Sequence, residues 1–330
     1  RMKAIADAIG FNLVVISPTI ALVLTALILL FFTITIESNE KVKQVITFSG
    51  VVSTLFCVFL KFGLFLQNGV SSYFSKKILL DEFSLFGNVL IGLILLFNIL
   101  PIWDSSSQLR EKTTEAIILT LMSTSGFMLM VDSENLIMLF IGLEIGSISL
   151  YALAGLNRVD KLSNEASLKY FLLGSLASCI FIYGVSLVYV SFSVLSVYDF
   201  ATGVGFVGAD SVPLTTKLGV ILIFIGLLFK IAAAPFQSWA PDVYQGSPTG
   251  YVGYMASVAK ASAFIVIARL CQVSLRFMPN EFDSFFLFVV ILSVVIGSIF
   301  ASVQDDLKRL LAYSGVVQSG FILSGIVSGI

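Results

Sequence analysis

The chain has 330 residues, of which 58% are hydrophobic and 12% are charged, and it contains no histidine and three cysteines. A mean hydropathy of +1.02 excludes an ordinary soluble domain, in which about 25% of the residues are charged. The formal net charge of −1 offers no basic surface for nucleic acid, so no nucleic-acid partner is expected. Without histidine, and with its cysteines far apart, the chain suggests no metal site.

Ten apolar segments follow one another along the chain, which predicts an all-α integral membrane protein with about ten transmembrane helices. Arg1 and Lys3 precede the first segment, which we interpret as a membrane anchor and not as a cleaved signal peptide because further spans follow it. We place the segments at residues 18–36, 45–66, 84–100, 116–131, 135–156, 166–190, 218–244, 250–271 and 284–303, and from 307 onward.

The fifth segment contains an acid, Glu144, about nine residues inside its apolar run. Three small residues surround this acid: Gly142, Gly146 and Ser147. Small residues on a transmembrane helix allow a neighbouring backbone to approach, so Glu144 is expected to face the inside of the bundle.

Three cations, Lys61, Lys169 and Arg269, lie near the ends of their predicted segments. Lys169 follows Glu165 at the start of the sixth segment, where it could extend to the membrane surface or bridge toward Glu144. Lys61 and Arg269 are both expected to extend to the membrane surface.

The longest polar connection, residues 191–216, carries Gly203, Gly205 and Gly208 in the spacing of a dinucleotide-binding loop. That loop requires a strand before it and a helix after it in a soluble βαβ unit. Because this connection joins two membrane spans, we predict a flexible glycine loop that binds no cofactor.

The seventh segment contains Lys230 near its middle and two prolines, Pro235 and Pro241, after it. Pro235 has no N–H for the carbonyl of Ile231, and its ring crowds that turn. Irregular backbone at membrane depth is tolerated only where protein or water satisfies it. The pattern therefore predicts a broken helix with polar space beside Lys230, and an ordinary proline kink remains the alternative.

The eighth segment carries Lys260 near its middle. Gly253, Ser257 and Ala261 recur every four residues on the same helix, which indicates a packed face. Lys260 is expected to project from that face into the bundle, because contact with lipid would cost more.

Each charge at mid-bilayer costs about 2.5–3.5 kcal/mol, so Glu144, Lys230 and Lys260 together cost roughly 8–10 kcal/mol unless they are hydrated or paired. Two arrangements of these residues would offset that cost. One is a set of fixed Glu–Lys ion pairs that hold helices together, and the other is a hydrated path for protons or other ions. One acid cannot pair fully with two lysines, and a lysine that loses its proton readily can carry protons.

Three stretches resemble the NADH dehydrogenase subunit 2 and subunit N family, the antiporter-like membrane subunits of respiratory complex I. They are WAPDVYQGSP at residues 239–248, EASLKY at residues 165–170 and KRLLAYS at residues 308–314. The resemblance extends from about residue 116 onward.

The resemblance implies an antiporter-like fold with two inverted five-helix repeats and a central polar axis for protons. Glu144, Lys169, Lys230 and Lys260 match the family's proton-relay positions. Gln318 stands where the family often has a histidine, so it would be a polar site that cannot titrate. The implied domains are three N-terminal helices at residues 1–115, a first repeat at 116–276, and the start of a second, incomplete repeat at 277–330. The resemblance also implies helices beyond residue 330, and hence a partial or split polypeptide.

We therefore predict a proton-translocating membrane subunit of a proton-pumping NADH:ubiquinone oxidoreductase. No cofactor is expected in this chain, because flavin and iron–sulfur clusters would belong to partner subunits. The expected partners are other complex I membrane subunits, including sister antiporter-like subunits, and lipids. A sodium/proton antiporter subunit, or a structural subunit with fixed ion pairs, remains open. The 30 phenylalanines favour the mitochondrial inner membrane, with the bacterial plasma membrane as the alternative.

Overall fold

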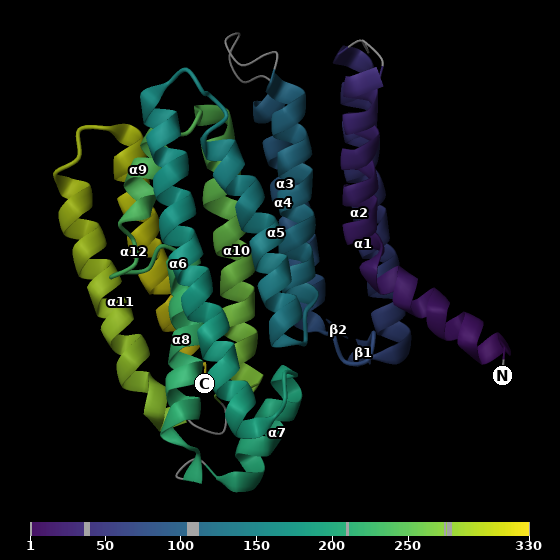
Figure 1. The fold of residues 1–330 in the computed structure, drawn as a ribbon, viewed down its shortest axis with the longest axis vertical. Coiled ribbons are helices and arrows are strands. Elements are labelled where there is room, and N and C mark those ends of the chain that lie inside the picture. The colour runs from purple at the N-terminus through teal and green to yellow at the C-terminus, as the bar shows by residue number, and fades with distance from the viewer. Residues whose placement is uncertain are drawn as a thin grey trace.

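The computed structural model describes residues 2–35, 40–103, 112–208, 211–273, 275 and 279–329. In these ranges the long helices run side by side along the longest axis of the molecule, and one short hairpin lies at an end of the bundle (Figure 1). The elements are α1 (Met2–Thr35), α2 (Glu40–Asn68), β1 (Ser71–Tyr73), β2 (Ile78–Leu80), α3 (Glu82–Trp103), α4 (Thr113–Asp132), α5 (Leu136–Ala154), α6 (Lys161–Phe192), α7 (Val197–Val207), α8 (Leu214–Lys230), α9 (Trp239–Gly246), α10 (Thr249–Val273), α11 (Pro279–Ser302) and α12 (Leu307–Val327).

Within the described ranges, nine helices are long and apolar enough to cross a membrane. They are α1 to α6 and α10 to α12. The remaining predicted segment is divided between α8 and α9, which are separated by residues 231–238. The prediction of an all-α membrane protein with a broken seventh helix is therefore confirmed.

The break begins four residues before Pro235, at the turn whose carbonyl the proline cannot bond. α8 ends at Lys230, immediately before the carbonyl that Pro235 cannot satisfy. Pro241 does not contribute to the break, contrary to the prediction. It lies in the first turn of α9, where a missing N–H costs no helical hydrogen bond.

The predicted glycine loop at residues 191–216 is wrong for residues 197–207, which form α7. Ser196 caps this helix by accepting from the N–H of Asp199. The helix buries one face at helical spacing, through Val197, Phe200, Ala201 and Val204. That apolar spacing outweighs the low helix propensity of its glycines.

The hairpin and α7 lie at the same end of the bundle, opposite α9 (Figure 1). β1 and β2 pair antiparallel, and Lys76 in their turn donates to Asp199 of α7 at 2.8 Å. This hydrogen bond raises the pKa of Lys76 above its ordinary value. The hairpin and α7 together cover the buried end of α4 and the beginning of α5.

α4 and α5 pack through glycines that let their backbones touch. A Cβ atom on Gly126 would lie 2.3 Å from the backbone nitrogen of Gly146, and one on Gly142 would lie 2.5 Å from that of Met130. This close packing places α5, which carries Glu144, in the interior of the bundle.

Candidate functional site

Lys230 lies at the end of α8 with only 2% of its surface exposed. Its Nζ donates to the Ser147 hydroxyl and to the Tyr151 hydroxyl, each at 2.9 Å. Nζ also lies 5.3 Å from the centroid of the Tyr151 ring, within cation–π range. In the described part of the chain, no carboxylate comes within ion-pair distance of this ammonium.

Glu144 lies one turn before Ser147 on α5 and accepts a hydrogen bond from Ser178 of α6. Its carboxylate makes no ion pair with Lys230 among the described residues, so the hypothesis of a fixed Glu144–Lys230 pair is wrong. Because residues three and four apart share a helix face, Glu144, Ser147 and Tyr151 form one polar strip along α5. The Ser147 and Tyr151 hydroxyls of that strip accept hydrogen bonds from Lys230.

Aromatic rings hold Tyr151 in place beside Lys230. The Tyr151 ring meets Tyr170 edge-on at 4.7 Å, and Tyr170 stacks on Trp239 at 4.5 Å. The indole of Trp239 donates to the carbonyl of Phe229, one residue before Lys230. A Cβ atom on Gly174 would lie 2.1 Å from the Tyr151 hydroxyl oxygen, so this hydroxyl needs a glycine opposite it.

The broken backbone after Lys230 is satisfied by serines from two other helices. Ser319 of α12 donates to the carbonyl of Ile231 at 2.7 Å, and the N–H of Ala234 donates to Ser293 of α11 at 2.9 Å. Polar protein groups thus satisfy two backbone groups of the break. The predicted polar space beside Lys230 stays a prediction.

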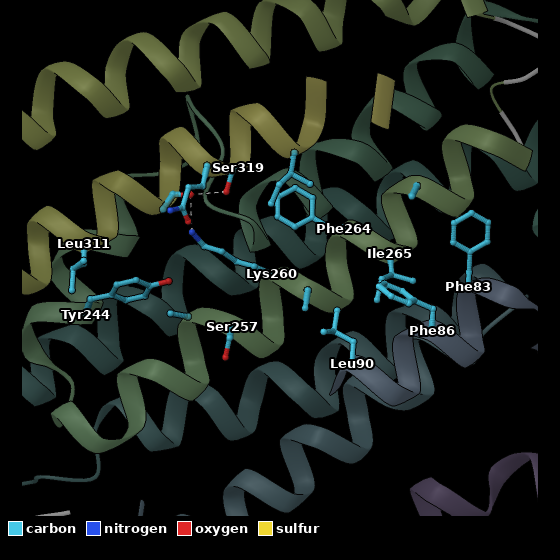
Figure 2. Close-up of a pocket in the computed structure, with 16 residues that line it drawn as sticks. Phe83, Phe86, Leu90, Tyr244, Ser257, Lys260, Phe264, Ile265, Leu311 and Ser319 are labelled. Carbon is cyan, nitrogen blue, oxygen red and sulfur yellow. Dashed lines mark hydrogen bonds between the residues drawn. The ribbon is translucent and has the colours of Figure 1, made fainter. Parts of the chain in front are cut away.

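Lys260 is joined to the break through the same serine. Its Nζ donates to the carbonyl of Gly315 at 3.1 Å, and the Ser319 hydroxyl lies 2.8 Å from that carbonyl oxygen (Figure 2). A Cβ atom on Gly315 would lie 2.7 Å from Nζ, so a larger residue here would displace the tip of the Lys260 side chain. We name the set Glu144, Ser178, Ser147, Tyr151, Lys230, Ile231, Ser319, Gly315 and Lys260 the polar axis. Within the described residues, no hydrogen bond joins the Nζ of Lys230 to Ile231 or Ser319, so these two parts of the axis meet through the backbone of the break.

Lys260 and Gln318 both line a cavity of about 630 Å³ between α3, α10 and α12 (Figure 2). Most of its wall is apolar, with Phe86 and Phe264 among the contributing side chains. Gln318 and Lys260 therefore contribute to the wall of the same cavity.

Lys169 is not part of the polar axis and forms ion pairs at the α9 end of the bundle. It pairs with Glu165 at 2.7 Å and with Asp242 of α9 at 2.8 Å, and it remains 42% exposed. Asp242 also pairs with Arg309 of α12 at 2.5 Å. These ion pairs attach α9 to α6 and α12.

The predicted surface positions of Lys61 and Arg269 are wrong, because their side chains are 0% and 2% exposed. Lys61 pairs with Asp132 at 2.6 Å, and Arg269 pairs with Asp81 at 2.6 Å. The hairpin and α7 cover this end of the bundle, so both acids stay inside and the cations turn toward them.

Sequence reasoning also missed the hydroxyl partners of the polar axis, namely Ser147, Tyr151, Ser178 and Ser319. One signal was present: Ser147 and Tyr151 stand three and seven residues after Glu144, on the same face of one helix. Ser319 carried no such signal, because its contact depends on how α12 packs against the break.

Residues 133–330 match a family model described as NADH:quinone oxidoreductase/Mrp antiporter, transmembrane region. The chain is 35% identical over 321 residues to NADH-quinone oxidoreductase subunit N of Trichlorobacter lovleyi, covering 96% of this chain and 64% of that protein. It is 44% identical over 214 residues to the subunit N of Parafrankia sp., covering 64% of this chain and 40% of that protein.

Among solved structures, a chain of respiratory complex I from Thermus thermophilus matches with a TM-score of 0.77 and 29% identity, over 94% of this chain and 64% of that one. A chain of the Mrp complex from Dietzia sp. matches with a TM-score of 0.78 and 18% identity, over 94% and 58%, which is a likeness of fold alone. The chain spans less than two thirds of the length of each of these proteins.

Proposed function

Because this chain belongs to the NADH:quinone oxidoreductase/Mrp antiporter transmembrane family, we propose that it translocates protons along the polar axis as a membrane subunit of respiratory complex I. The observation that carries the proposal is Lys230, a buried amine at a break in a membrane helix whose partners are two hydroxyls. An amine held by hydroxyls can exchange its proton without breaking an ion pair.

The hydroxyl groups supply the transfer steps. The hydroxyl groups of Tyr151 and Ser147 can donate as well as accept hydrogen bonds, so they can take a proton from Lys230 or return one to it. On the other side of the break, Ser319 lies between the carbonyls of Ile231 and Gly315, and the Gly315 carbonyl accepts from Lys260. Water beside these carbonyls would carry the proton between the Lys230 hydroxyl partners and Lys260.

Access from the α9 end is supported by a second cavity of about 380 Å³. Tyr151 forms part of its wall, together with the polar side chains of Asn164 and Ser167. Water in this cavity would contact Tyr151, the residue whose hydroxyl binds Lys230.

Electrostatic coupling along the axis is large enough to drive transfer. Two unit charges about 6 Å apart interact by roughly 3 kcal/mol at an effective dielectric near 20. A change of one unit of charge at that distance from a lysine would then alter its proton affinity by about a hundredfold.

Partners and cofactors follow from the same proposal. The chain would assemble with other complex I membrane subunits, including sister antiporter-like subunits, while flavin and iron–sulfur clusters would reside in partner subunits. The relatives from Trichlorobacter and Parafrankia are bacterial, which favours the bacterial plasma membrane over the mitochondrial inner membrane.

We propose residues 116–276 as the first repeat, since α4, α5, α6, the broken α8–α9 pair and α10 make up nearly all of it.

A sodium/proton antiporter subunit is the second candidate. The description of the matching family model names the Mrp antiporter beside NADH:quinone oxidoreductase, which favours this candidate. Transport by the isolated chain in vesicles, without NADH, would support this candidate.

The proposal is tested with Lys230→Ala and Glu144→Gln in the assembled complex, with assembly, NADH oxidation and proton translocation all measured. We expect normal assembly with translocation and activity depressed in both variants. Lys161→Ala, an exposed lysine at the start of α6, is the matched control. Normal translocation with impaired assembly would instead favour a structural subunit.

A further inference from the structure

A second group of buried charges lies at the end of the bundle opposite α9, outside the polar axis. Lys61 of α2 pairs with Asp132, the last residue of α4, and the two side chains are 0% and 2% exposed. Asn88 of α3 donates to the same oxygen of Asp132 at 2.6 Å. Three helices therefore meet at one carboxylate.

This group has hydrogen-bonding capacity that the described residues leave unused. Asn88 is fully buried, and its side-chain oxygen has no partner in the described part of the chain. Lys61 has three N–H donors, of which one is used, for Asp132. The second oxygen of Asp132 accepts no hydrogen bond from any described residue.

The unused groups are of the kind that a buried water requires. Such a water makes about three hydrogen bonds to buried polar groups that otherwise lack partners. Here Lys61 can donate to it, while the free oxygens of Asn88 and Asp132 can accept from it.

The neighbouring charges are fully engaged, so the spare capacity is confined to this group. Arg269 binds Asp81 through two nitrogens at 2.6 and 3.0 Å, and it also donates to the carbonyls of Val131 and Ser133. Glu134 accepts from two serine hydroxyls, one on the hairpin and one at the beginning of α7.

Together these five ionisable residues carry a formal charge of −1. Three are acids, Asp81, Asp132 and Glu134, and two are cations, Lys61 and Arg269. Lys76 in the hairpin turn, which pairs with Asp199, also interacts with Glu134.

We propose that Lys61, Asp132 and Asn88 form a second proton-binding site, which holds a water molecule and one exchangeable proton. Transfer of a proton from the ammonium of Lys61 to the carboxylate of Asp132 yields a neutral amine and a carboxylic acid, with no other reactant. Uptake of one more proton from water leaves the ammonium beside the acid. This site rests on the proposed function, because it serves proton translocation by the same chain.

Fold stability alone does not require these charges. A buried ion pair is often replaced by apolar residues of similar size with no loss of stability, whereas removal of one partner costs about 3–5 kcal/mol. A double apolar replacement therefore separates a structural role from a proton-binding role.

The test compares the parent with a double variant that carries both Lys61→Met and Asp132→Leu, each in the intact complex. Assembly and the ratio of protons translocated per NADH oxidised are measured. We expect assembly with a ratio lowered by about twofold or more, because the site can no longer exchange a proton. The matched control replaces the exposed pair Lys76 and Asp199 with alanine, at the same end of the bundle, and should leave the ratio unchanged.

Assembly of the double variant with a normal ratio would overturn the site. Lys230→Ala is measured alongside: if it lowers the rate of proton translocation while the double variant keeps a normal ratio, this inference fails and the proposed function stands. A normal rate of proton translocation in Lys230→Ala would instead remove the proposed function.

Two further measurements decide the matter if the double variant does not assemble. Asn88→Leu keeps the ion pair and removes only the amide, so we expect a lowered ratio, and an unchanged ratio would contradict the site. A high-resolution map of the parent complex should show an ordered water bonded to Lys61 and Asn88, whereas a dry site would refute it.

Discussion

The hydroxyl of Ser319 lies 2.7 Å from the carbonyl oxygen of Ile231 and 2.8 Å from that of Gly315. One side chain on α12 thus connects the break after Lys230 with the carbonyl that binds Lys260. The two lysines are linked through backbone carbonyls, with a serine as the only side chain between them in this link.

Replacement of this serine tests the link. Ser319→Ala leaves the buried carbonyl of Ile231 without a partner, which costs about 1–3 kcal/mol. We expect assembly to be retained and proton translocation to fall about fivefold or more, as 1 kcal/mol in a transfer step implies. Ser324→Ala on the same helix is the control, because that exposed serine donates only to its own helix. Equal translocation in the two variants would show that Ser319 is not part of the route.

Gly174→Ala tests the placement of Tyr151. The new methyl group would lie 2.1 Å from the tyrosine hydroxyl, so this hydroxyl must leave the position in which it accepts from Lys230 at 2.9 Å. Overpacking of this kind costs about 1–3 kcal/mol, although alanine normally favours a helix over glycine. We expect reduced translocation with normal expression. The same change at Gly63, which has open space around it, should be neutral or stabilising.

Lys169→Met tests whether the ion pairs at the α9 end hold the half-helix or carry protons. Partly exposed ion pairs contribute about 0–1 kcal/mol each, so the loss of two should lower the thermal midpoint slightly. The decrease should shrink at high salt, because salt screens these charges. Asp242→Asn should behave alike, since it removes the shared partner of Lys169 and Arg309. A loss of translocation at unchanged thermal stability would place Lys169 in the relay.

Acid should weaken the start of α12. The N–H of Arg309 donates to Asp306 at 3.0 Å, and this hydrogen bond lowers the pKa of Asp306 below its ordinary value of 3.8. A carboxyl with a lowered pKa stabilises the fold above its ordinary pKa, and that stabilisation is lost as the pH falls through the lowered value. Asp306→Asn keeps the cap but cannot titrate. The difference between the thermal midpoints of parent and variant should therefore change as the pH falls below 3.8, where the carboxyl of the parent becomes protonated, and a constant difference would exclude this role.

Lys230 and its broken helix could be found from the sequence because both signals are local. A lysine within an apolar run, followed by a proline, indicates an interrupted helix whatever its neighbours are. The helix spans were predictable for the same reason, since the length and hydropathy of each segment decide them.

The partners of Lys230 could not be predicted, because they depend on packing between segments far apart in the chain. Ser147 and Lys230 are brought together by the contact of α5 with α8, which no local pattern specifies. The same limit explains Lys61 and Arg269. Near the ends of their helices, both would reach water if the hairpin and α7 did not cover them.

The end of α8 at Lys230 has an electrostatic consequence of its own. Aligned peptide dipoles give the C-terminus of a helix a partial negative charge, and a cation in the last turn gains about 0.3–1 kcal/mol, or up to about 2 kcal/mol where it is partly buried. Lys230 occupies that turn. The interruption of the helix thus supplies a negative field for the ammonium, and an unbroken helix through residue 235 would move that field away from it.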